Sequence, residues 1–203
     1  MNKLHSLCLL LVCASSFSQE KNLTFPSYGG NEFETFQSYI VNNFKIPDWV
    51  LMHKPRGKIV LEFSITDKGY IDSISIWNGV HKELEKEAIR ILKETDGRWT
   101  PATKDGKPVG VKILCPFITI DTEESIYSYE EEYKIFFEKA EDNFLKENYK
   151  NALKYYLKCV NLEPMLKENY FKISICYKNL GDLKMSESYK KKSERLSDFP
   201  EIR

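Results

Sequence analysis

Residue types that do chemistry are present in the sequence, but none has the spacing of a catalytic or metal-binding motif. Histidines and cysteines bind metals when they recur at short fixed distances, and serine becomes a nucleophile on a strand-to-helix elbow. His53 and His81 have no second histidine or cysteine at ligand spacing, and GxSxG, GxxxxGK[ST] and GxGxxG do not occur. We therefore expect no catalytic, cofactor-binding or metal-binding residues, and a protein that is not an enzyme.

The cysteines also lack a reactive pattern. Five cysteines without CxxC spacing are too few for a disulfide scaffold. Cys8 and Cys13 lie near the N-terminus, which leaves Cys115, Cys159 and Cys176 in the rest of the chain. The last two fall on neighbouring predicted helices, where either a disulfide or two small buried thiols fits the sequence.

Composition excludes several classes of protein. The 203 residues allow one large domain or two small ones. Thirty basic and 30 acidic side chains give a formal net charge of zero, which argues against a nucleic-acid partner. Aromatic residues make up 13%, too many for a disordered chain.

The segment 1–18 has the pattern of a secretory signal peptide. Lys3 precedes a mostly apolar run over residues 4–14, and small residues precede a predicted cleavage between Ser18 and Gln19. The apolar run is about half the length of roughly 20 residues that a membrane span needs. We expect a periplasmic protein, with an uncleaved inner-membrane anchor as the alternative; lipid attachment at Cys13 is disfavoured by the bulky residue before it.

The elements that follow change from helical to strand periodicity. Residues 19–31 are polar and predict a flexible lead, and apolar residues at helical spacing predict a helix over 33–44 that ends before Pro47. Alternation then predicts strands over 59–65 and 70–77. The connecting turn is Asp67-Lys68-Gly69, an amphipathic helix is predicted over 80–92, and Asp105-Gly106 marks a further turn.

A third strand is predicted over residues 111–120, and both of its faces are apolar. Pro116 cannot donate to a ladder, so this strand is expected at a sheet edge, where it must be covered or paired. The alternation places Val111, Ile113, Cys115 and Phe117 on one face and Leu114, Ile118 and Ile120 on the other, with Lys112 near the start.

From about residue 123 the strand pattern disappears and a repeat begins. One constant offset along the chain relates Asn148-Tyr149 to Asp182-Leu183, Ala140 to Ser174, and Ala152 to Ser186. That offset equals the period of the tetratricopeptide helix-turn-helix repeat, which is about 34 residues. The sequence predicts at most two such units, whose aromatic residues form an inter-helix core and in part line a groove for a second protein.

Three segments of the first half resemble the C-terminal domain of TonB, the energy transducer of Gram-negative outer-membrane transport. The segments are Gly57-Lys58-Ile59-Val60-Leu61-Glu62-Phe63-Ser64-Ile65-Thr66-Asp67-Lys68-Gly69, Asn78-Gly79-Val80-His81-Lys82-Glu83-Leu84-Glu85-Lys86-Glu87-Ala88, and Trp99-Thr100-Pro101-Ala102 with Asp105-Gly106-Lys107-Pro108-Val109. Each is weak alone, but their order and spacing over residues 32–121 make the likeness strong. The helix-then-proline entrance looks most like versions from Bacteroidota.

The resemblance implies an α+β fold with a three-stranded antiparallel sheet and two helices over residues 32–122. The repeat period predicts an all-α, tetratricopeptide-like domain over 123–203. In the family, the last strand binds the TonB-box peptide of an outer-membrane transporter by strand addition, a step in TonB-dependent transmembrane transport. The implied peptide-binding edge is Val111, Lys112, Ile113, Leu114, Cys115, Phe117, Ile118 and Ile120. The alternative is an envelope scaffold protein that forms a homodimer through this edge.

Overall fold

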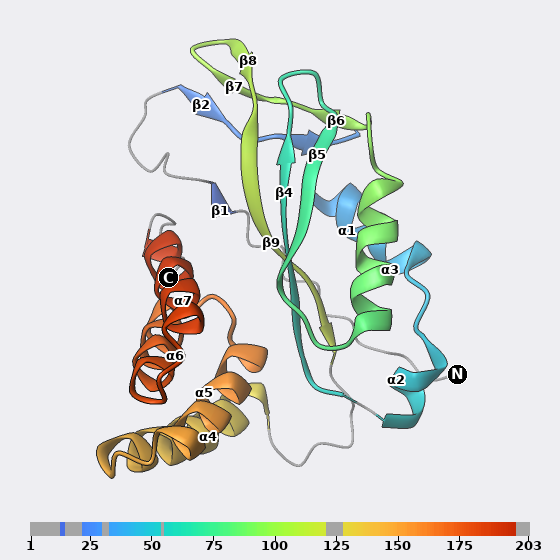
Figure 1. Ribbon diagram of the computed structural model, residues 1–203. Helices are drawn as coiled ribbons and strands as arrows, with labels where there is room; N and C mark the ends of the chain where they lie inside the picture. Colours follow the sequence, from blue (N-terminus) through green and yellow to red (C-terminus); the bar gives the residue numbers. More distant parts are fainter. Residues whose placement is uncertain (1–12, 15–21, 30–32, 54, 121–127, 198–203) are drawn as a thin grey trace. The chain divides into compact units, whose positions relative to one another are not determined.

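The chain divides into two compact units, one within residues 1–122 and one within 123–198 (Figure 1). The computed structural model describes residues 13–14, 22–29, 33–53, 55–120 and 128–197. The first unit combines antiparallel sheets with helices, and the second consists of helices. The predicted fold class is therefore confirmed, and each unit is described by itself below.

The main sheet of the first unit is antiparallel, with the order β1-β9-β4-β5. Its long strands are β4 (Gly57–Ile65), β5 (Ile71–Asn78) and β9 (Val111–Ile120), and β1 is the dipeptide Cys13–Ala14. These long strands match the three that alternation predicts. The dipeptide β1 adds a fourth strand that the sequence pattern does not show.

Helices cover one face of this sheet (Figure 1). They are α1 (Phe33–Asn43), the short α2 (Asp48–His53) and α3 (Lys82–Lys93). The alternate β4 residues Ile59, Leu61, Phe63 and Ile65 are buried against them. The helix α2, which the sequence did not predict, begins directly after the proline that ends the preceding segment. Burial of alternate strand residues under helices is the expected two-layer packing.

The segment predicted as a flexible lead is different in the structure. Its described part contains β2 (Leu23–Thr24) and β3 (Ser27–Tyr28). The partner of β2 is β7 (Ala102–Lys104), which also pairs with β8 (Lys107–Val109), and the partner of β3 is β6 (Trp99–Thr100). Both partners belong to a distant part of the chain, beyond α3. Tertiary pairing orders residues whose local sequence has no strand period.

The register of β9 also differs from strict alternation. Ile59 lies opposite Ile118, whereas the next β4 residue, Val60, lies opposite Pro116. Phe117 is thus the extra residue of a bulge. The proline falls at this irregularity, where a strand tolerates it. Beyond the bulge, the two-face assignment predicted for the whole strand no longer follows from simple counting.

The second unit is built from two helical hairpins. Its helices are α4 (Tyr129–Leu145), α5 (Tyr149–Leu162), α6 (Lys167–Asn179) and α7 (Leu183–Ser197). Glu147 and Gly181 both have positive φ angles, 56° and 85°, in the turns that end α4 and α6. These two positions are related by the same offset as the repeated residues, so the turn geometry has the same period as the sequence.

Small buried residues and one polar cluster join the helices of the second unit. Ala140 and Ala152 are fully buried where α4 and α5 pack. The Glu141 carboxylate of α4 accepts hydrogen bonds from Tyr156 of α5 and from Lys172 Nζ of α6, the latter 2.9 Å away. Burial raises the pKa of Tyr156 above its ordinary value, and its bond to Glu141 adds to that shift. One carboxylate therefore connects both hairpins.

The turn between β4 and β5 generates the first prediction. Gly69 has a φ of +79°, and a Cβ there would lie 1.9 Å from the Trp99 backbone oxygen. Gly106 has a similar φ of +76° with nothing within 4 Å of its Cβ position. We expect Gly69→Ala to lower the free energy of unfolding by about 3 kcal/mol and the control Gly106→Ala by about 1 kcal/mol.

Tryptophan fluorescence during denaturant unfolding measures both variants, because all three tryptophans lie in the first unit. Equal losses in the two variants would show that the backbone conformation alone, and not the close approach to Trp99, makes glycine necessary at this turn.

Candidate functional site

The outer side of β9 lies at one end of the main sheet, next to the dipeptide β1, and β5 forms the other end. On its inner side β9 pairs with β4 from Val111 to Ile120. On its outer side the dipeptide β1 pairs with it antiparallel, Cys13 opposite Leu114 and Ala14 opposite Ile113. Within the described residues, no strand pairs with the rest of this outer side. Among the described residues, the outer side of β9 therefore pairs with this short extended segment alone.

Most of the described side chains of β9 are buried in the protein core. Ile113, Cys115 and Phe117 belong to the core beneath the helices, and Leu114 is buried as well. Val111 is half-buried, and Lys112 is exposed, with its ammonium group 3.7 Å from the Glu62 carboxylate of β4. The side chains of Ile118 and Ile120, and the predicted cleavage site at Ser18 and Gln19, lie outside the described residues. What β9 offers a partner is chiefly its backbone.

Aromatic packing holds β9 from behind. The Phe36 ring of α1 lies 6.0 Å from the Phe117 ring and 4.8 Å from the Trp99 ring, both edge-on. Trp99 is buried and its indole N–H donates to the Thr95 hydroxyl at 3.0 Å. Trp99 is part of the core cluster above the sheet. Because α1 is packed on β9, anything that fixes α1 also fixes the edge strand.

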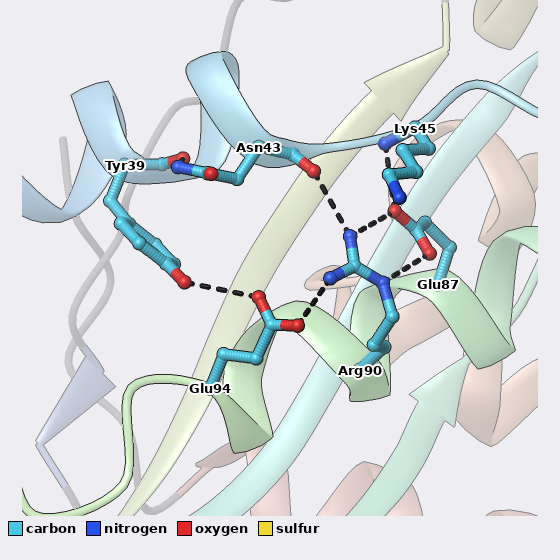
Figure 2. A network of polar contacts seen from close by, with 6 residues as sticks. All are labelled: Tyr39, Asn43, Lys45, Glu87, Arg90 and Glu94. Atoms are coloured by element: carbon cyan, nitrogen blue, oxygen red, sulfur yellow. Dashed lines mark hydrogen bonds and ion pairs between the residues drawn. The ribbon is translucent and has the colours of Figure 1, made fainter.

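A polar network fixes α1 to α3, with Arg90 at its centre (Figure 2). The Arg90 guanidinium donates to Glu87 and to Glu94 at 2.5 Å each, and to the backbone oxygen of Asn43 at 3.0 Å. Tyr39 of α1 donates to Glu94 at 3.1 Å. This network joins the C-terminal end of α1 to the outer surface of α3. The sequence predicts an amphipathic helix over residues 80–92, but its pattern does not identify the partners of Arg90.

The network shifts the titration of its members. The hydrogen bond that Arg90 donates to Glu87 holds the pKa of Glu87 below its ordinary value. The Lys45 backbone N–H also donates to Glu87, at 2.7 Å, and lowers this pKa further. Arg90 also lowers the pKa of Glu94. Burial, followed by the hydrogen bond to Glu94, raises the pKa of Tyr39. Both carboxylates are therefore stabilised in their charged form.

His53 and His81 lie against Trp49. The His53 ring stacks on the Trp49 ring at 4.6 Å, and the His81 ring stacks on it at 3.7 Å with only 6° between the planes. His81 is also the N-cap of α3, where its side chain accepts from the Glu83 N–H at 3.4 Å. The described residues contain no group of three or more potential metal ligands. The contacts of both histidines explain their presence through packing and capping.

The two thiols of the second unit are buried and are not joined to each other. Cys159 and Cys176 are both fully buried, and burial raises the pKa of Cys159 to about 12 and of Cys176 to about 11. A thiol with a raised pKa is a weak nucleophile. Of the two interpretations that the sequence left open, the structure has buried thiols.

The first unit is thus a two-layer α+β domain in which the described residues pair with the outer side of β9 only at Ile113 and Leu114. Residues 47–118 match the protein family described as Gram-negative bacterial TonB protein C-terminal. The resemblance found in the sequence over residues 32–121 is confirmed for this stretch. The match runs from just before α2 through most of β9.

One solved structure is similar to part of the chain. It is the solution structure of the C-terminal domain of TonB from Helicobacter pylori, at 17% sequence identity and a TM-score of 0.34, covering 45% of this chain and 81% of that domain. No curated protein matches the chain. Among the described residues, every helix is too short or too polar to span a bilayer.

The Arg90 network predicts a loss of stability when its centre is removed. We expect Arg90→Gln to lower the free energy of unfolding by about 2 kcal/mol, because several charge-assisted hydrogen bonds are lost at a partly exposed site. The control Lys93→Gln lies on the same helix and is exposed; its cost should be about 0.3 kcal/mol. Tryptophan fluorescence during denaturant unfolding measures both, and equal costs would contradict a central role for Arg90.

The lowered pKa of Glu87 predicts how stability depends on pH. Its ionised form stabilises the folded state above the ordinary value of 4.5, and this contribution is lost as pH falls through the lower folded value. The difference in unfolding free energy between the unsubstituted chain and Glu87→Gln should therefore be largest near neutral pH and shrink in acid. In an Arg90→Gln background the same difference should be small at every pH; an unchanged pH dependence there would argue against Arg90 as the cause.

Proposed function

We propose that the first unit is a periplasmic, non-enzymatic binding module for an extended peptide. The peptide adds as a strand to the outer edge of β9, and its source is the TonB-box segment of an outer-membrane transporter. This places the protein in TonB-dependent transmembrane transport. The helices of the second unit form a tetratricopeptide-like groove for another protein.

The observation that carries this proposal is the pairing of β1 with β9. An extended dipeptide lies antiparallel on Ile113 and Leu114, so the outer side of β9 has the spacing and direction that strand addition needs. The dipeptide belongs to the segment that is expected to be removed as a signal peptide. Its removal leaves the edge available. The match of residues 47–118 to the TonB C-terminal family supports the nature of the partner.

An envelope scaffold that forms a homodimer is the alternative, and it uses the same edge. Two copies of β9 can pair antiparallel about a two-fold axis, because such pairing is self-complementary. Unlike peptide addition, this pairing depends on protein concentration. The oligomeric state of the chain therefore separates the two functions.

The deciding experiment compares peptides that differ in their backbone, all against the same form of the protein. Synthetic TonB-box peptides are titrated into the chain without residues 1–18, and backbone amide shifts are followed by NMR. We expect shifts concentrated on residues 111–120. Methylation of alternate peptide nitrogens should abolish binding in one of the two possible patterns and spare it in the other, because only every second N–H of an added strand points toward β9.

Two outcomes contradict peptide addition. Equal binding by both methylated peptides would show that backbone pairing is not used. No shifts at millimolar peptide, together with a concentration-dependent dimer in sedimentation experiments, would favour the scaffold.

A further inference from the structure

A pair of half-buried aromatic rings lies on the first hairpin of the second unit. Phe136 of α4 and Tyr155 of α5 stack with their centroids 6.4 Å apart and 29° between their planes. Other α4 residues form hydrogen bonds with α6: Tyr133 donates to Asn169, and Glu141 accepts from Lys172. The ring pair therefore takes no part in these two hydrogen-bonded contacts with α6.

Three exposed lysines surround these rings. Lys158 Nζ lies 4.5 Å from the centre of the Phe136 ring, and Lys139 and Lys154 lie 6.0 and 5.9 Å from the centre of the Tyr155 ring. These are cation–π distances, so the rings hold the ammonium groups in place. We call Phe136, Tyr155 and these three lysines the lysine–ring cluster.

The charges of the lysine–ring cluster are not neutralised. Within the described part of the chain, none of its three ammonium groups has a carboxylate at ion-pair distance. Other lysines of this unit do: Lys146 lies 2.8 Å from Asp142, and Lys190 lies 3.7 Å from Glu194. Three positive charges are thus gathered over an apolar surface.

Unpaired ammonium groups next to aromatic rings suit a ligand that has both carboxylates and an apolar side chain. The ammonium groups offer donors to carboxylates, and the rings between them offer an apolar surface to an aliphatic or aromatic side chain. The first turn of α4 carries Glu130, Glu131 and Glu132, which repel any anionic ligand that extends along the helix to them. A short acidic segment can end before this turn, whereas a long nucleic acid with its continuous row of phosphates fits less well. The zero net charge of the chain points the same way.

We propose that the lysine–ring cluster is a docking site for an acidic protein segment with an apolar side chain among its carboxylates. The site is separate from the β9 edge, lies wholly within the second unit, and does not depend on the function proposed for the first. Complementary charge selects the segment and increases its rate of association, and the ring pair accepts its apolar side chain.

The test uses the full chain and a dye-labelled synthetic peptide of glutamates with a central leucine. We expect saturable binding, measured by fluorescence anisotropy, that weakens as salt rises from about 50 to about 500 mM. The triple variant Lys139→Gln, Lys154→Gln, Lys158→Gln keeps the aliphatic stems and should bind roughly tenfold more weakly. The matched control Lys150→Gln, Lys178→Gln, Lys184→Gln removes the same charge from exposed positions and should change affinity by less than about twofold.

Circular dichroism verifies that both triple variants keep the helical content of the unsubstituted chain. Three results would overturn the proposal: no binding of the peptide, equal weakening in the two triple variants, or tighter binding of a single-stranded oligonucleotide or an anionic lipid vesicle than of the peptide. Equal weakening would mean that overall charge, and not the lysine–ring cluster, attracts the peptide.

Discussion

Burial of one face of the main sheet beneath α1 and α3 is the constraint on which the first unit depends. The inward residues of β4 and β9 form one core with the helices and with Trp99. This packing buries most of the described side chains of β9. The groups of β9 that can still bind another strand are therefore the backbone N–H and C=O groups along its outer side. Apolar contacts are not directional, so the hydrogen bond from Arg90 of α3 to the Asn43 backbone helps to orient α1. Since Phe36 of α1 rests on Phe117, this orientation extends to the edge strand.

The two units use different means of recognition. In the first, partners would be recognised by backbone hydrogen bonds, which are tolerant of sequence. In the second, the lysine–ring cluster offers localised charge and apolar surface, which select for composition. The second unit is also stabilised differently, because its repeated hairpins make mostly local contacts and the Glu141 carboxylate joins α4, α5 and α6. In the two proposals, each unit therefore offers its own surface to a protein partner.

The sequence by itself determined those features that depend on local periodicity. Alternation predicted the three long strands, the bounds of β9 agree with the predicted residues 111–120, and helical spacing predicted α1 and α3. The repeat period in the second half foretold the matching turns at Glu147 and Gly181. A signal for the start of α4 was also present but was not used: Ser128 and Glu131 form a capping box.

Only the tertiary structure decided the features that depend on residues far apart in the chain. The strands β2 and β3 are dipeptides, too short to show a period in the sequence. They form because β7 and β6 supply their hydrogen-bond partners. Both partners come later in the chain, after β4, β5 and α3. The bulge at Phe117 depends on the register against β4, and the partners of Arg90 and Trp49 come from other elements. Local pattern records which face of an element is apolar, but it carries no information on which distant group will meet a given side chain.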